Sequence, residues 1–397
     1  MRIFKKILLS VLIALVALQV PFIYRRYQLG KVAETIAASN ASRIVRSDDK
    51  YDEYIAIIHA HTFLGGHSTG TFEELISGAN EAGVDVVFMT EHWADEYDTS
   101  ALTLNGKYGR TLFVGGNEID TADGDRFLMI PGSSDAASLR RSSTDAVLSK
   151  LHAEQRLGLI TYPEKYNSWN AAFDGVEVFS LHTSAKAMNK FTAPLDVIWS
   201  GRAYPGLTFA QYFRRPDENL AKYDLATQKR RVTLFAGTDA HSNIGFHLFG
   251  DDSGNKFLNF KLDPYEFSFS VARVHLLVPK GTPMTRETAV EAIKTGRFFT
   301  GNDAIGPTDG FRFSAGEATF GDETSAVNVQ LLNVFVPVSS RIVTLKNGVK
   351  FDEQTAIGEV DIRHDGAGVY RVEVYRDDLG EAFSKMPWIM SNPIYLR

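Results

Sequence analysis

The chain has 397 residues and an ordinary globular composition, with 44% hydrophobic residues, 23% charged residues and a formal net charge of −6. This length accommodates one large domain and a smaller one. Lysine and arginine are scattered rather than clustered, so we expect no nucleic-acid partner. The chain has no cysteine. Disulfides and thiolate zinc sites are therefore excluded, and any metal must be held by His, Asp and Glu.

An apolar run over residues 7–24 predicts a membrane segment near the N-terminus. Its 18 residues approach the length that spans a bilayer, and Leu15 makes Ala17 a poor signal-peptidase site. We therefore predict an uncleaved single-pass signal anchor over 1–26 and a polar stalk over 27–50. A cleaved signal peptide is the alternative. Basic residues before the run favour a body outside the cytoplasm, in the periplasm, although basic residues also follow it: Arg2, Lys5, Lys6, Arg25 and Arg26.

From Tyr54 onward, short apolar strands alternate with helical segments. The predicted strands cover 55–58, 84–90, 112–115, 127–130, 159–161, 176–179 and 232–236, and the predicted helices begin at Thr71, with Glu74 completing a capping box, and cover 144–155, 220–229 and 286–295. This alternation favours an α/β domain over 51–309 with a parallel sheet, open or closed into a barrel. From residue 310 the pattern alternates apolar and polar residues, which predicts a small antiparallel β domain over 310–397 with a structural or docking role.

Residues that commonly bind metals directly follow several of these strands. His59 and His61 follow the strand 55–58, and alternate residues of an extended chain point the same way. The other such residues are His67 after a Gly-Gly pair, His92 after 84–90, Glu118 after 112–115, and Asp239 and His241 after 232–236. A lone histidine after a strand is usually a satisfied polar residue. Five histidines and two carboxylates at the carboxyl ends of strands instead predict a shared metal site.

Four short motifs resemble those of the polymerase-and-histidinol-phosphatase (PHP) superfamily. They are His59-x-His61-Thr62, Thr90-Glu91-His92, Gly116-Asn117-Glu118 and Gly237-Thr238-Asp239-Ala240-His241. The segments Gly175-Val176-Glu177-Val178, 295–300 and 387–395 are similar to the carbaryl-hydrolase-like branch of that superfamily. The resemblance covers residues 54–305 well and the C-terminal region more loosely.

This resemblance implies a distorted (β/α)7 barrel. In trinuclear members of the superfamily, one ion takes the residues that match His59, His61, Glu118 and Asp239, and another takes those that match His67, His92 and His241. The remaining ion needs two further histidines, and here Arg126 and Tyr162 stand near those positions. We therefore predict two ions, with Arg126 and Tyr162 binding an anionic oxygen of the substrate. The alternative is that Arg126 only pairs with Asp120 or Asp125.

The predicted ligands define the expected chemistry. A site with three neutral imidazoles leaves the charge of its ion uncompensated, and such an ion acidifies a bound water. We expect a hydrolase that uses a metal-bound hydroxide on small-molecule phosphoesters, with two divalent ions of zinc, manganese or iron. Carboxylic or carbamic ester or amide hydrolysis is one alternative, and a non-catalytic, metal-stabilised binding module is another.

Several further residues receive weaker predictions. We expect Glu91 to orient a ligand histidine, Glu177 to support a ligand or contact the substrate, and His247 to have even odds of a supporting role. For Glu177, a buried structural ion pair is an equally good interpretation. We interpret His182 as an exposed loop histidine, although it could line the entrance of the site, and His152 and His275 as structural residues.

Overall fold

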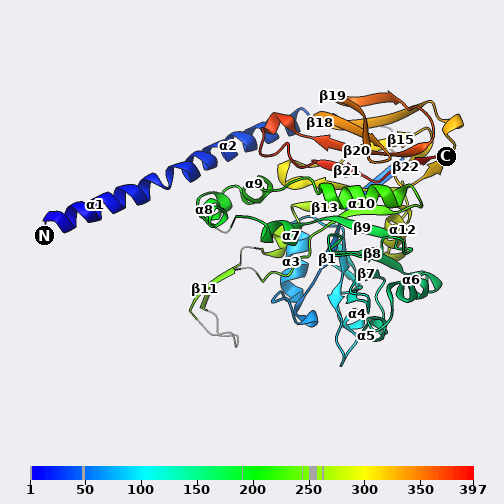
Figure 1. The fold of residues 1–397 in the computed structure, drawn as a ribbon, viewed down its shortest axis with the longest axis horizontal. Coiled ribbons are helices and arrows are strands. Elements are labelled where there is room, and N and C mark those ends of the chain that lie inside the picture. Colours follow the sequence, from blue (N-terminus) through cyan, green and yellow to red (C-terminus); the bar gives the residue numbers. More distant parts are fainter. Residues whose placement is uncertain (1, 47–49, 190, 244, 250–256, 262) are drawn as a thin grey trace.

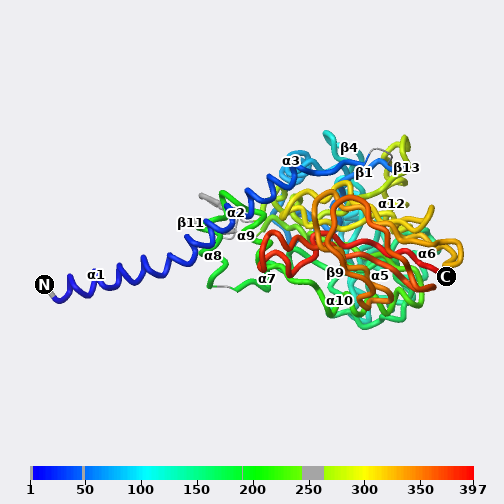
Figure 2. Tube along the Cα trace, turned by 90° about the horizontal axis from the view of Figure 1, so that it is seen from above, coloured from blue at the N-terminus to red at the C-terminus, as the bar shows by residue number. Residues whose placement is uncertain are grey.

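The computed structural model describes residues 2–46, 50–189, 191–243, 245–249, 257–261 and 263–397, and for residue 2 and for 245–249 and 257–261 it describes the backbone alone. A long N-terminal helix projects from a body of sheets and short helices (Figures 1 and 2). The C-terminal strands form one end of this body, and the chain segments that carry the predicted metal ligands lie in the other part.

The predicted membrane segment forms the helix α1 (Arg2–Ala17), which runs on almost in line into α2 (Val20–Ala41). Only 6% of its most apolar 18-residue window is buried, which excludes a core helix for this segment. Length and composition suit a membrane span, and an anchor and a signal sequence both satisfy that test. The predicted stalk is helical over much of its length and touches the body through α2, whose Phe22 and Leu29 are buried.

The strands of the described residues form two large sheets and a hairpin. The larger sheet contains β1 (Tyr51–Ala60), β2 (Val86–Met89), β4 (Gly106–Tyr108), β5 (Thr111–Val114), β13 (Ala272–Pro279), β14 (Phe298–Asn302), β15 (Arg312–Ala315), β16 (Ala318–Thr319), β17 (Glu323–Thr324), β18 (Leu331–Lys346), β19 (Val349–Arg363), β20 (Gly368–Tyr375), β21 (Ile389–Ser391) and β22 (Ile394–Leu396). The smaller sheet contains β3 (Glu91–His92), β6 (Asn117–Asp120), β7 (Arg126–Ile130), β8 (Leu157–Ile160), β9 (Gly175–Ser180) and β10 (Thr233–Gly237). The hairpin pairs β11 (Gly245–Phe249) with β12 (Phe257–Lys261).

A closed (β/α)7 barrel is not confirmed, because no closed sheet forms among the described residues. The chain passes from the larger to the smaller sheet between β2 and β3 and between β5 and β6, and β7 lies antiparallel to both of its neighbours. The two sheets meet where the segment after β10 reaches β1. There the Thr238 amide donates to the carbonyl of Ile58 (3.1 Å), and Ala60 and Ala240 form a parallel bridge.

The four helices predicted to flank the sheets are present as α3 (Phe72–Glu81), α6 (Thr144–Ala153), α10 (Asp217–Thr227) and α12 (Arg286–Thr295), and the structure adds shorter ones. The shorter ones include α4 (Thr99–Leu102), α5 (Ala136–Leu139), α7 (Leu181–Lys186), α8 (Thr192–Asp196), the π-helical turn η2 (Val197–Gly201), α9 (Pro205–Ala210) and α11 (Tyr265–Ser268). The capping box of α3 is present, with the Thr71 hydroxyl accepting from the Glu74 amide and the Glu74 carboxylate accepting from the Thr71 amide.

The C-terminal strands extend the larger sheet instead of forming a detached one. β21 pairs with β14, and β14 pairs with β13, so the antiparallel strands beyond residue 310 continue the sheet that begins with β1. β18 and β19 form a long hairpin with bulges, which is the antiparallel structure that the alternating pattern predicts. Hydrophobic side chains from both parts share a single large core cluster, among them Phe299, Phe311, Val372 and Trp388.

Candidate metal centre

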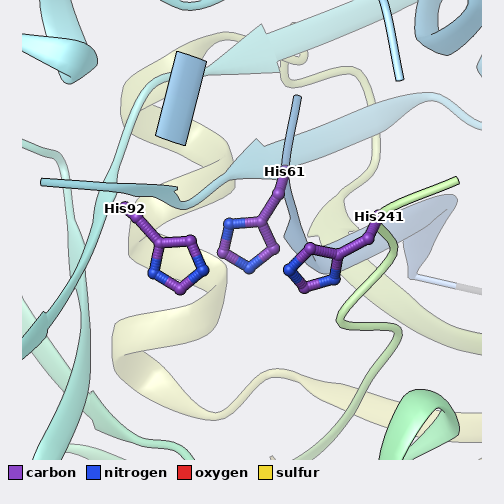
Figure 3. Close-up of side chains that lie close together, drawn as sticks. All are labelled: His61, His92 and His241. Atoms are coloured by element: carbon purple, nitrogen blue, oxygen red, sulfur yellow. The ribbon is translucent and has the colours of Figure 1, made fainter. Parts of the chain in front are cut away.

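The predicted ligands converge because the strands that precede them end at one place. His59 and His61 lie at the carboxyl end of β1 and just after it, His92 ends β3, and Glu118 lies in β6. Asp239 and His241 follow β10, which β1 reaches through the bridge between Ala60 and Ala240. Figure 3 shows the imidazoles of His61, His92 and His241 side by side, each from a different segment.

One group of ligand atoms surrounds two carboxylate oxygens. Glu118 Oε2 lies 3.4 Å from His59 Nε2 and 3.3 Å from His61 Nε2. Asp239 Oδ1 lies 3.4 Å from the same two nitrogen atoms. These four residues offer ligand atoms that lie within 4.8 Å of one another, and all four are buried.

Two further groups share members with the first. His61, His92 and His241 form one, with the His61 ring centroid 4.5 Å from each of the other two. His182, Asp239 and His241 form the other, and the rings of His182 and His241 lie 5.2 Å apart. Because the groups overlap, their donors form one continuous array.

The unpartnered atoms of this array fit a cation. Among the described residues, neither ring nitrogen of the buried His61 has a hydrogen-bond partner, and neither has Asp239 Oδ1, although the carboxylates of Glu118 and Asp239 lie close to His61 Nε2. A buried polar atom without a partner costs about 1–3 kcal/mol, so such atoms are rare unless something else binds them. Lone pairs of carboxylate oxygen and imidazole nitrogen converge here, and these donors suit zinc, manganese and iron.

Neighbouring polar groups fix the orientation of the ligand side chains. Glu177 Oε1 accepts from His59 Nδ1 at 2.8 Å, which directs His59 Nε2 toward Glu118 and Asp239. The carbonyl of Asp239 accepts from His241 Nδ1 at 2.8 Å. The Tyr162 hydroxyl donates to Asp239 Oδ2 at 2.7 Å and leaves Oδ1 available. Each of these bonds occupies one side of a ligand and leaves the other side for a cation.

The site also concentrates backbone strain. His59, Tyr162, Asp239 and Ser242 all adopt left-handed φ angles, between 47° and 74°. Each such residue other than glycine costs on the order of 1–3 kcal/mol, and this strain is typical of functional sites. His59 lies in a bulge where the register of β1 against β2 shifts, so regular strand alternation is not the reason that it meets His61.

Close packing of a glycine supports the same geometry. A Cβ at Gly237 would lie 1.7 Å from Glu177 Oε1, so only glycine leaves room for the carboxylate that holds His59. Thr161 also donates to Glu177 from its hydroxyl group.

Burial and mutual charge set the protonation of the ligands. Burial lowers the pKa of His61 to about 3 and also lowers the pKa of His92. Burial opposes the ionised form of Glu118, but the neighbouring histidines outweigh it and lower its pKa to about 2. For His59, burial opposes the charge, yet nearby carboxylates, Glu177 first among them, raise its pKa well above the usual value. A cation that binds here therefore displaces a proton from His59.

A cavity of about 880 Å³ opens onto the array and is large enough for a small molecule. His92, His182 and His241 line it, together with polar and charged residues that include Arg126, Arg140, Tyr162 and Lys186. The Arg140 guanidinium stacks 3.7 Å from the ring centroid of Trp93 and forms no ion pair with the described residues. Asp95, Glu96 and Asp120 line the same cavity, so it places charges of both signs beside the candidate ligands.

Comparison with known proteins gives only weak structural likenesses. No family model and no curated protein matches the chain. A solved structure of PsfC from Pseudomonas syringae PB-5123 aligns with a TM-score of 0.38 and 14% identity over 60% of this chain and 88% of that one. A two-domain protein from Bacteroides vulgatus ATCC 8482, described as containing a predicted PHP-like metal-dependent phosphoesterase, aligns with a TM-score of 0.36 and 12% identity over 89% and 98%.

A third solved structure is the lesion-specific endonuclease PfuEndoQ from Pyrococcus furiosus, with a TM-score of 0.37 and 11% identity over 68% of this chain and 63% of that one. All three scores are low, so the function proposed below rests on the side chains of the site. The three structures give no support to the carbaryl-hydrolase-like branch, which stays a prediction.

The structure brings together six of the seven predicted ligands and leaves His67 at the edge. His67 is exposed, and its ring lies 4.9 Å from the ring of His92, outside the three groups of ligand atoms. Its backbone carbonyl accepts from Asn243 Nδ2 at 2.9 Å. His61 takes the place beside His92 and His241 that the resemblance implies for His67.

Arg126 pairs with Asp120, as the alternative prediction held, and it also contacts Glu118 in the candidate metal centre. Its Nε donates to Asp120 at 2.6 Å, and one terminal nitrogen lies 3.5 Å from Glu118 Oε1. Asp125 does not pair with it, since this buried carboxylate accepts from Thr144 Oγ1 and the Asn167 amide. The guanidinium also lies 5.1 Å from the ring centroid of Tyr162.

Two carboxylates were predicted to support the site, Glu91 and Glu177, and the contacts of Glu91 differ from its predicted role. Glu91 contacts no histidine ring among the described residues. It accepts from the amide and hydroxyl of Thr62 (2.9 and 2.7 Å) and from the hydroxyl of Thr103, and so holds the turn after His61. Glu177 performs the orienting role instead, at His59. The side chain of His247, on β11, lies outside the described residues.

His182 was predicted to be an exposed loop histidine, with a place at the entrance of the site as the alternative, and the structure places it in the cavity lining and in a group of candidate ligands. It is half-buried at the start of α7, where burial lowers its pKa to about 4. It follows the carboxyl end of β9, which is the same placement that identified the other ligands. That rule, applied to the strand 176–179, would have found it.

Proposed function

We propose that the chain is a metal-dependent hydrolase that acts on phosphoesters. The observation that carries the proposal is the convergence of buried carboxylates and imidazoles at the base of an open cavity, where the ring nitrogens of His61 and Asp239 Oδ1 have no hydrogen-bond partner among the described residues. A purely structural metal site is closed and needs no cavity, whereas a catalytic site keeps an open position.

Two divalent ions fit the array. His59, His61, Glu118 and Asp239 would hold one, and His92 and His241 would hold the other, with His182 at its open side. When bound, such ions supply a Lewis acid that polarises the ester and acidifies a water molecule. Zinc, manganese and iron are all compatible with these donors.

The protein's own side chains orient the ligands and the substrate. Glu177 keeps the proton on His59 Nδ1, and Tyr162 holds Asp239 by its outer oxygen. Arg126 places a fixed positive charge beside Glu118 and lines the cavity, and its one remaining guanidinium nitrogen, Nη2, suits an anionic oxygen. Arg140 and Lys186 line the same cavity and offer further positive charge to an anionic ester, alongside the acidic Asp95 and Glu96.

A substrate screen with metal removal tests the proposal. The purified protein should contain divalent metal, hydrolyse phosphoesters, lose this activity to a chelator and regain it when metal is restored. Activity confined to carboxylic esters, carbamates or amides would support the alternative class of hydrolase. Bound metal without hydrolysis of any of these substrates would instead indicate a binding module.

We also propose that α1 is retained as a membrane anchor and that the body lies outside the cytoplasm. The support is the exposed apolar surface of α1 and the basic residues at its start, before the apolar run over residues 7–24. Membrane-extracted protein should keep its N-terminus in mass analysis. Soluble protein shortened after Ala17 would show that the segment is a cleaved signal.

A further inference from the structure

The segment from Phe191 to Trp199 exposes large apolar side chains beside the N-terminal helix. Phe191 is 86% exposed and Ile198 is 75% exposed, and they lie at the start of α8 and within η2. Scattered exposed apolar residues are ordinary, but these two share one short segment that packs against α2. In both views α8 lies at the end of the body from which α1 projects (Figures 1 and 2).

Specific polar contacts tie this segment to the end of the apolar run. Trp199 Nε1 donates to Gln19 Oε1 at 2.9 Å, and the Gln19 side-chain amide donates to the carbonyl of Leu15. Arg25 pairs with the buried Asp196 at 3.1 Å, and Arg26 donates to the carbonyl of Trp199. The segment is therefore fixed to the helix at a defined height.

That height places the segment at a bilayer surface. An apolar helical run over residues 7–24 is about 27 Å long at about 1.5 Å per residue, close to the roughly 30 Å hydrocarbon core. Gln19 lies five residues before the end of the run, roughly 7 Å inside that end. A side chain hydrogen-bonded to Gln19 lies at a similar depth, within the roughly 5–10 Å that the apolar face of an interfacial helix penetrates and just below the headgroup level at which tryptophan is enriched.

We propose that the segment Phe191–Trp199 is a second, interfacial membrane contact, and that its partner is the lipid bilayer that holds α1. Phe191 and Ile198 enter the boundary between headgroups and acyl chains, as the apolar face of an interfacial helix does. Arg25 lies where its charge meets the headgroups. The contact rests on the anchor proposed for α1 and is independent of the proposed hydrolase activity.

The contact also fixes where the cavity faces. His182 and Lys186 line the cavity from α7, and α8 follows α7 closely in the chain. Two attachments, α1 and this segment, restrict rotation of the body about the single helix. The wall of the cavity formed by α7 is thereby held near the bilayer surface.

The absence of cysteine makes a site-specific test clean. The full-length protein would carry one introduced cysteine, at Ile198→Cys, Leu12→Cys or Val327→Cys, labelled with bimane in nanodiscs of phosphatidylcholine with brominated acyl chains. Leu12 lies in α1, and Val327 is 91% exposed in the C-terminal part. We expect loss of fluorescence at positions 12 and 198 and none at 327.

The outcomes separate the two membrane contacts. Quenching at 12 but not at 198 overturns the interfacial contact and leaves the anchor standing, and quenching at neither position overturns both. A second variant, Phe191→Asp added to Ile198→Cys, should reduce the quenching at 198 because it places a charge in the boundary. Leu225→Asp, at an exposed apolar site on α10, is the matched control and should not change it. Equal effects of the two aspartates would also overturn the contact, and unchanged metal content in each variant would show that the body remains folded.

Discussion

Two buried clusters of ionisable residues in this protein differ in whether their polar atoms have hydrogen-bond and ion-pair partners within the protein. At the seam between β1, β13 and the C-terminal strands, His275 donates to Glu53 (2.7 Å) and to Thr308 Oγ1 (2.8 Å), and Thr308 donates to Asp303 (2.6 Å). Arg312 pairs with Glu53, and Arg273 pairs with Asp303. In the candidate metal centre, by contrast, the ring nitrogens of His61 and the Oδ1 atom of Asp239 have no hydrogen-bond partner among the described residues, and a cavity opens beside them.

This difference shows that burial of histidines and carboxylates does not by itself identify a metal site. In the seam, each of the two carboxylates pairs with a cation and both ring nitrogens of His275 have partners, so among the described residues no carboxylate there is left for an ion to bind. In the metal centre, carboxylates and neutral imidazoles have convergent lone pairs. The seam around His275 is therefore a buried cluster in the same protein with which the candidate metal centre can be compared directly.

Removing a carboxylate from the metal centre should have the largest effect. Asp239→Ala and Glu118→Ala each remove a negative charge that compensates a bound cation. We therefore expect bound metal and activity to fall by more than the roughly 10–100-fold that is typical when a residue that only orients a metal ligand is substituted. Elemental analysis and hydrolysis rates provide the measurement. Unchanged metal content in both variants would show that the ligands are assigned wrongly.

Substitution in the seam should destabilise the protein without affecting metal. His275→Gln leaves buried carboxylates less compensated, and breaking a buried ion pair costs about 3–5 kcal/mol. Denaturant unfolding of wild type and variant gives the loss. Metal content should stay at the wild-type value, and a fall in bound metal with unchanged stability would reverse the distinction between the clusters.

The same residue predicts a pH dependence. Burial opposes the charge of His275, but Asp303 and Glu53 outweigh it and raise its pKa from 6.5 to about 9. A raised pKa in the folded state stabilises the protein fully below pH 6.5, and this contribution is lost as pH rises through 9. The wild-type free energy of unfolding should therefore fall across that interval, and His275→Gln should remove this part of the slope. An unchanged slope in the variant would contradict the assignment.

Arg126 should matter for anionic substrates. Arg126→Ala should leave two ions bound. It should lower kcat/KM for phosphoesters by a factor equivalent to a loss of about 1.5–3 kcal/mol in transition-state stabilisation, the size of a charge-assisted hydrogen bond. Neutral esters are the control, because they lack the charge that the guanidinium meets. Normal kinetics of the variant on its best anionic substrate, or three ions in the wild type, would leave Arg126 as a partner of Asp120 alone.

Glu177 should act through His59. Glu177→Gln keeps the shape of the side chain but removes its charge, so we expect metal affinity to fall about 10–100-fold. Metal titration monitored by calorimetry would show it. Gln has nearly the same size, so a folding defect is not expected, and an unchanged affinity would mean that Glu177 only fills space beside Gly237.

Much of the site could be predicted because strand ends are visible in the sequence. Apolar runs located β1, β2, β5 and β10, and the ligand-type residues after them meet in the structure. The separate sheets could not be predicted, because pairing at β7 and the shift from β2 to β3 depend on contacts between distant segments. His67 is displaced because loop conformation, unlike strand position, has no periodic signal, whereas His182 follows a strand that the sequence located. The contact of Trp199 with Gln19 spans 180 residues and has no local signature.

Anomalous diffraction from crystals that contain zinc or manganese tests the central claim most directly. The account predicts anomalous peaks among His61, Glu118 and Asp239 and beside His92 and His241, and none at the seam around His275. Crystals that contain the metal but show no peak between Glu118 and Asp239, or that show one at the seam, would contradict it.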